Sequence, residues 1–386
     1  MKLLLFAFAV LLIMTQEERH LISPKDLTGS CGENMNFTFI SENGTLLING
    51  TGNTNQYDIN KQNWPWRRSL IKTIIIDEGV ELISKNCFYE HLELESVSLP
   101  NTLIGIGPYA FFNCENLSSI IIPDRVTFIS NYAFSYCSSL KTVRLSDNIK
   151  ELSARVFAEC TSLVSINIPN AIESISDPFF HCTSLPEIHI PINSKVSAIY
   201  KYCFESCLSL TSITFNDYLT NIREGAFRNC IGLTTIKLPD SLKYIEKNAF
   251  ALCNKLETVF IGMGLYQIYE NAFYSCSSLR LVSVNTTERI IVDKNALKNC
   301  ENCYYVHVPY NYKGSLSDQP RLLKTKIAVG KCGDKARWSY NTTDYSLTIF
   351  GSGPMGNYEV NQYHRYNIID VIVEDGITTI GHDRDE

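Results

Sequence analysis

Cysteine and histidine are the residue types in this 386-residue chain that could carry metal or redox chemistry. The chain has 14 cysteines and seven histidines. The pairs Cys300 and Cys303, and Cys203 and Cys207, have spacings that zinc ligands can adopt. The alternative is a column of buried thiols that pack as small apolar side chains. Most of the cysteines recur at one position of a repeat, which favours packed thiols, so we expect no metal site.

The spacing of nine cysteines, here called the ladder cysteines, gives the length of the repeat, because successive ones lie 22 to 25 residues apart. In most copies an aromatic residue lies three positions before the ladder cysteine and a leucine lies three positions after it. Each copy approximates A-F-x-x-C-x-x-L-x-x-I-x-[IL]-P, and an earlier copy has His91 at the cysteine position. The ladder cysteines are Cys114, Cys137, Cys160, Cys182, Cys207, Cys230, Cys253, Cys276 and Cys300.

The repeat pattern predicts the elements that position these residues. The alternation at the end of L-x-x-I-x-[IL] is typical of a short strand, and the proline that follows ends it. The segment A-F-x-x-C suits one short helical turn with phenylalanine and cysteine facing inward. A unit of this size cannot bury its apolar face alone, so stacked units are expected to form a solenoid. We therefore predict a mainly-β α/β repeat solenoid with one continuous parallel sheet of about eleven strands from near Leu70 to Pro309.

The same unit resembles the BspA-type class of leucine-rich repeat, which occurs in microbial and protist surface antigens. The resemblance covers roughly residues 70–309. It implies a right-handed leucine-rich-repeat solenoid that attaches to host or neighbouring-cell proteins through its sheet face.

The flanks of the repeats are related to each other. Residues 31–58 and 332–359 match at a constant offset of 301 positions. In the first copy, alternating apolar residues around Asn43-Gly44 predict a β-hairpin, as expected for a cap on a solenoid end. The predicted organisation is an N-terminal cap at 16–69, a linker at 310–330 and a second cap-like module at 331–386. Either the second module begins a truncated tandem, which we favour, or it folds back to close the far end.

The N-terminus predicts export. Lys2 is followed by an apolar run from Leu3 to Met14, which fits a signal peptide at residues 1–15, although a small-x-small cleavage site is missing. A buried strand is the alternative. We expect a secreted or cell-surface protein, with no other transmembrane segment in this chain. Six candidate glycosylation sites agree with this route. They are Asn36, Asn43, Asn49, Asn116, Asn285 and Asn341.

The outward-facing strand positions are the candidate binding surface. One column of these positions holds mostly small hydroxyl side chains, whereas the next column is varied and carries large or basic residues. Large anchors on a flat face are what protein recognition uses. We expect the partner to be a protein or glycan on another cell or in the matrix. The candidate ligand-binding residues are Arg144, His189, Lys237, Phe260, Tyr305 and His307.

Other functional classes receive little support. The net charge is −6 and the basic residues are scattered, so we expect no nucleic-acid partner. The chain has no recognisable nucleophile elbow, phosphate-binding loop or metalloprotease motif. We therefore expect neither catalytic activity nor a cofactor. The alternative to a binding protein is a structural, self-associating surface-coat repeat without a defined ligand.

Overall fold

The chain divides into two compact units. The N-terminal unit extends to Ile149 and includes Ser153–Ile166; the C-terminal unit holds Lys150–Leu152 and the residues from Asn167 onward. The expected signal peptide lies outside the described residues. No helix in the part of the chain that the structure describes could span a bilayer. The computed structural model describes residues 26–61, 63–67, 69–303, 306–309, 311–314, 322–324, 327–331, 336–341, 346–351, 353–354, 370–373 and 377–379.

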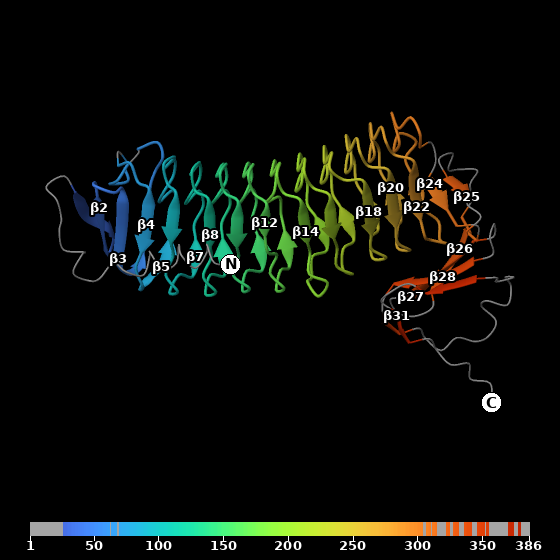
Figure 1. Ribbon diagram of the computed structural model, residues 1–386, viewed down its shortest axis with the longest axis horizontal. Coiled ribbons are helices and arrows are strands. Elements are labelled where there is room, and N and C mark those ends of the chain that lie inside the picture. The colour runs from blue at the N-terminus through green and yellow to red at the C-terminus, as the bar shows by residue number, and fades with distance from the viewer. Residues whose placement is uncertain are drawn as a thin grey trace. The chain divides into compact units, whose positions relative to one another are not determined.

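The I-x-[IL] segment of each repeat forms a short strand that runs parallel to its neighbours, so the prediction of a mainly-β parallel solenoid is confirmed (Figure 1). The strands alternate between buried and exposed side chains, as in β18, where Ile236 and Leu238 are buried and Lys237 is exposed. These repeat strands are β4 (Thr73–Ile76), β6 (Ser96–Ser98), β8 (Ser119–Ile121), β10 (Thr142–Arg144), β12 (Ser165–Ile166), β14 (Glu187–His189), β16 (Ser212–Thr214), β18 (Thr235–Leu238), β20 (Thr258–Ile261), β22 (Leu281–Val284) and β24 (Val306–Val308).

Pairing between the repeat strands is not continuous. In the N-terminal unit β4 pairs with β6, and β8, β10 and β12 form a separate three-stranded sheet. In the C-terminal unit β14 pairs with β16, and β18, β20, β22 and β24 form one sheet with the additional strand β25 (Leu322–Lys324). Strands of two to four residues offer few hydrogen bonds each, so regular pairing is easily interrupted between two neighbours. The single sheet expected from the repeat is therefore a series of shorter parallel sheets.

A second set of parallel strands lies at the L-x-x-I part of the repeat, after the repeat strand. Most of these strands have two residues, and a buried aliphatic residue anchors each of them, such as Ile222, Ile245 and Val292. They are β5 (Val80–Ile83), β7 (Gly105–Ile106), β9 (Phe128–Ile129), β11 (Glu151–Leu152), β13 (Ser174–Ile175), β15 (Ala198–Ile199), β17 (Asn221–Ile222), β19 (Tyr244–Ile245), β21 (Gln267–Ile268) and β23 (Ile291–Val292). The repeat thus forms two narrow parallel ladders where one was expected.

The A-F-x-x-C segments form hydrogen-bonded turns where short helical turns were expected. Their backbone groups bond to the next repeat: the Phe227 amide donates to the Ala249 carbonyl at 2.8 Å, and the Asn229 amide donates to the Ala251 carbonyl at 2.8 Å. Residues with positive φ, such as Asn229 at 61°, interrupt the right-handed backbone that a helix needs. Bonds between repeats therefore replace bonds within a helix.

Buried phenylalanines from these turns stack along the core of each unit. In the N-terminal unit the rings of Phe111 and Phe134 lie 5.1 Å apart, and in the C-terminal unit Phe227 and Phe250 lie 5.1 Å apart, with nearly parallel planes. At the N-terminal end Trp66 stacks on Phe88 at 5.8 Å. This column is the shared core that a single repeat could not form.

The N-terminal cap is a β-hairpin, as expected. Strands β1 (Leu27–Gly32), β2 (Asn34–Ile40) and β3 (Thr45–Asn53) pair antiparallel, and β3 then pairs in parallel with β4 and β5. The hairpin buries Phe37, whose ring meets Trp66 edge to face at 5.1 Å. The cap thereby covers the first ring of the aromatic column.

The second cap-like module repeats this pairing scheme. Residue Ser346 pairs with Asp370 as Thr45 pairs with Thr73. The segment expected to be a linker contributes β25 and β26. The strands of the module are β26 (Ile327–Lys331), β27 (Ala336–Asn341), β28 (Ser346–Gly351), β29 (Gly353–Pro354), β30 (Asp370–Val373) and β31 (Ile377–Thr379).

Candidate functional site

The outward side chains of the repeat strands form the surface named here the strand face. Its first column consists mainly of serine and threonine, and two pairs of these hydroxyl groups bond across neighbouring strands. The hydroxyls of Thr73 and Ser96 lie 3.2 Å apart, and those of Thr235 and Thr258 lie 2.8 Å apart. Because the side chains in this column are short, a partner could approach the backbone of the strands closely.

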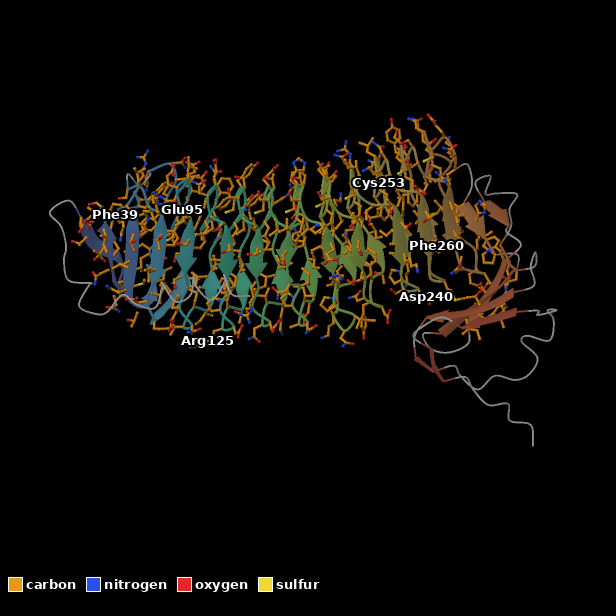
Figure 2. All side chains as sticks on the ribbon, in the orientation of Figure 1. Phe39, Glu95, Arg125, Asp240, Cys253 and Phe260 are labelled. Atoms are coloured by element: carbon orange, nitrogen blue, oxygen red, sulfur yellow. The ribbon has the colours of Figure 1, made fainter. Side chains whose placement is uncertain are left out.

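The second column brings four of its residues into one row in the C-terminal unit, here called the anchor row. Lys237 of β18 pairs in register with Phe260 of β20, which pairs with Ser283 of β22, which pairs with His307 of β24. Lys237 is exposed, and Phe260 leaves 38% of its surface accessible. Figure 2 shows Phe260 on its strand, between the turn that carries Cys253 and the loop that carries Asp240. The anchor row therefore presents an aromatic ring beside a cation on a flat sheet.

His307 closes the anchor row and is half-buried. Burial lowers the pKa of its imidazole below the ordinary value of 6.5. The ring is therefore neutral at neutral pH and offers one donor and one acceptor rather than a charge. The neighbouring candidate Tyr305 lies outside the described residues.

The other two candidates are not in the anchor row. His189 of β14 places Nδ1 3.3 Å from the Thr214 hydroxyl and Nε2 3.6 Å from the Glu187 carboxylate. In the N-terminal unit, the Arg144 guanidinium lies 3.3 Å from the Asp124 carboxylate. Both pairs are largely exposed, where ion pairs add little stability. These side chains remain accessible to a ligand, but each already has a polar partner.

Sequence reasoning missed a hollow of about 240 Å³ on the turn segments of the C-terminal unit. Its lining residues belong to the turns that precede the repeat strands and not to the strands themselves. The signal that could have located it is a small residue, Ala251, between larger residues at the same repeat position. The hollow is lined by Tyr202, Arg228, Asn248, Ala251, Leu252, Asn271 and Tyr274.

The ladder cysteines are buried and structural. The Cys137 thiol donates to the Phe111 carbonyl at 3.2 Å, and the Cys253 thiol donates to the Phe227 carbonyl at 3.1 Å, one repeat back in each case. Desolvation raises the pKa of Cys230 well above its ordinary value. In the described ranges, no group of three or more histidine, cysteine, aspartate or glutamate side chains is placed to hold a metal ion.

Two candidate glycosylation sites face each other on the cap hairpin. Asn36 of β2 pairs directly with Asn49 of β3, and both are exposed. Asn43 and Asn116 are also exposed, whereas Asn285 is half-buried. Asn341 ends β27.

Comparison with known proteins places this repeat in a family. The model of the BspA-type leucine-rich repeat region matches residues 81–197 and 197–315, which is more than half of the chain. No curated protein sequence matches. Similar solved structures include a leucine-rich repeat protein from Eubacterium ventriosum, with 19% identity, coverage of 73% of this chain and 90% of that chain, and a TM-score of 0.45. A leucine-rich cell surface protein from Faecalibacterium prausnitzii has 22% identity, coverage of 78% and 98%, and a TM-score of 0.42. The pneumococcal vaccine antigen PcpA has 15% identity, coverage of 77% and 97%, and a TM-score of 0.41. On the match of the family model, the chain belongs to the BspA-type leucine-rich-repeat family.

Proposed function

We propose that this protein is a secreted or cell-surface binding protein that engages a protein on another cell or in the matrix through the strand face of its C-terminal unit. The observation that carries the proposal is the anchor row, in which Lys237, Phe260 and His307 lie in register on neighbouring strands. Leucine-rich-repeat solenoids are typically binding scaffolds without catalytic activity, and extended surfaces of this kind are what repeat proteins use for recognition.

The physical case rests on the contrast between the two columns. Parallel strands lie about 4.8 Å apart, so the anchor row places different chemistries within one side-chain length of each other. The exposed ring of Phe260 can bury apolar area on a partner, while Lys237 can pair with an acid at the rim. A few large anchors carry most of the energy of protein interfaces, and small surrounding residues exclude water. The small hydroxyl side chains of the first column, beside the anchor row, suit the role of excluding water.

The signal-like N-terminus and the sequons support the proposed location. An apolar run of 12 residues after Lys2 suits export, and five of the six sequon asparagines lie where the structure describes their accessibility, four of them exposed. This location is part of the proposal.

The test is attachment of the purified chain to cultured cells and to surfaces coated with matrix proteins. Phe260→Ala should weaken attachment by at least about tenfold, while the melting temperature stays within the small range expected of an outward residue. The matched control is Ile121→Ala, which removes an exposed apolar side chain of the same column in the N-terminal unit. Ser119→Ala and Thr142→Ala should also leave attachment unchanged.

Two results would contradict the proposal. If Phe260→Ala attaches as strongly as the parent chain, the partner uses another surface. The second result is self-association of the parent chain in sedimentation that Phe260→Ala abolishes, together with attachment that does not depend on which cell or matrix protein is offered. In that case the anchor row joins copies of this chain in a surface coat.

A further inference from the structure

The hollow on the turns of the C-terminal unit has a simple structural origin. Backbone bonds between turns bring Arg228, Ala251 and Tyr274 to the same position of three successive turns: the Asn229 amide donates to the Ala251 carbonyl, and the Leu252 amide donates to the Tyr274 carbonyl, both at 2.8 Å. The small Ala251 lies between two long side chains, which leaves about 240 Å³ unfilled. The hollow is thus a consequence of one small residue between two bulky residues at the same position of neighbouring turns.

One wall of the hollow depends on a glycine. Gly225 has φ of 63°, and a Cβ built there would lie 2.5 Å from two ring carbons of Tyr202. The Tyr202 ring therefore covers the backbone of the next turn, which only glycine permits.

The lining backbone is held in a conformation that most side chains avoid. Tyr202, Asn248, Leu252 and Asn271 have φ of 59°, 56°, 66° and 57°. Asparagine tolerates this region, but a residue such as Leu252 does so at a cost of about 1–2 kcal/mol. The bonds between turns fix these residues, so the hollow is formed before any ligand arrives.

The hollow is polar but carries little net charge. Its one charged lining residue, Arg228, lies 2.6 Å from the carboxylate of Glu205, so the cation is already neutralised. The amide oxygen Oδ1 of Asn271 is buried and has no hydrogen-bond partner among the described residues. This oxygen is closed to water, and a buried acceptor without a partner costs about 1–3 kcal/mol; a rotation of the Asn271 side chain that brings the oxygen to a ligand hydroxyl in the hollow would recover that cost.

From this geometry we propose that the hollow binds one neutral sugar ring, such as a terminal hexose of a glycan. A sugar hydroxyl can donate to the Asn271 oxygen, and another can pair with the side-chain amide of Asn248. The apolar C–H faces of the sugar can pack on the rings of Tyr202 and Tyr274. The volume is below the range of about 300–1,000 Å³ that holds drug-sized ligands, so it suits a single ring. An anion would have to displace Glu205 from Arg228, which makes acidic ligands poor candidates. This site is separate from the anchor row and does not depend on the proposed function.

The experiment uses the full chain and a set of methyl glycosides of glucose, galactose, mannose and N-acetylglucosamine. Saturation-transfer NMR detects contact, and titration calorimetry measures affinity. At least one glycoside should bind saturably with a millimolar dissociation constant, as is reasonable for one small ring. Glucuronate and inorganic phosphate are the anionic comparisons and should bind more weakly.

Variants locate the binding. Ala251→Leu fills the hollow and should weaken binding by at least about tenfold. If Ala251→Leu lowers the melting temperature markedly, Tyr274→Ala is the second test. Tyr274 is half-exposed, and its truncation removes a lining ring without adding volume to the core. Lys298→Ala is the matched control, because Lys298 is exposed at the equivalent position of the next turn and does not line the hollow. Phe260→Ala should also leave sugar binding unchanged.

Three results would overturn the proposal. These are no saturable binding of any glycoside, tighter binding of glucuronate or phosphate than of the neutral sugars, and unchanged binding in both Ala251→Leu and Tyr274→Ala.

Discussion

Lowering the pH should destabilise the N-terminal unit through His91. This residue occupies the ladder position of the first repeat, is 6% exposed, and leaves Nε2 without a partner among the described residues. Burial lowers its pKa from 6.5 to about 4. Its imidazole is therefore neutral in the folded chain across the range in which an unfolded chain takes up a proton.

The sign and size follow from proton linkage. Above pH 6.5 both states hold a neutral ring, so His91 imposes no pH-dependent cost. As the pH falls from 6.5 towards 4, the unfolded state binds a proton that the folded state excludes, and the free energy of unfolding decreases. Each pKa unit corresponds to about 1.4 kcal/mol, so about 2 kcal/mol should be lost at pH 5 and about 3 kcal/mol once the pH is below 4.

The assay is urea unfolding at pH 7.5, 6 and 5, followed by the fluorescence of Trp64 and Trp66, in a Trp338→Phe background that removes the signal of the second module. The comparison variant is His91→Cys, which installs the residue that the ladder carries elsewhere and removes the titrating group. Other groups titrate in this range, so the measured quantity is the difference between the two chains. The parent should lose about 2 kcal/mol more than His91→Cys between pH 7.5 and 5. Equal losses in the two chains would refute this role of His91.

Three further predictions concern the core, the thiols and the cap. Phe227→Ala should cost about 3–5 kcal/mol, because the ring is fully buried between Phe204 and Phe250, and hydrogen exchange should show lost protection only in adjacent repeats; loss across every repeat would contradict nearest-neighbour packing. The ladder cysteines should resist iodoacetamide at pH 8 until the chain is denatured, because all nine are buried; mass spectrometry of labelled peptides would reveal early labelling of the native chain. In a glycosylating secretory host, glycopeptide mass spectrometry should find Asn36 or Asn49 occupied, but seldom both on one chain, because paired strand positions lie only about 5 Å apart; frequent double occupancy would rule this out.

The repeat pattern alone was sufficient to predict the core and the class of fold. Because each repeat buries the same positions, the spacing of Phe227, Cys230 and Leu233 identified inward side chains, and all three are fully buried. The alternation of apolar residues around Asn43-Gly44 likewise predicted the hairpin of the N-terminal cap, because strand alternation and an Asn-Gly turn are local signals. Membership of Lys237 and Phe260 in one outward column could also be predicted, because side chains alternate along a strand.

The tertiary structure decided the features that depend on contacts between repeats. The A-F-x-x-C segments look helical in isolation, but their amides bond to the next turn, so turns with positive φ replace helix. The breaks between the repeat sheets depend on the hydrogen-bond geometry between neighbouring short strands, which a sequence period does not specify. The hollow beside Ala251 depends on which side chains of three turns meet in space, together with the ring of Tyr202 over Gly225. Local spacing determines which face a residue occupies, whereas its neighbours across repeats are determined only when the chain is stacked.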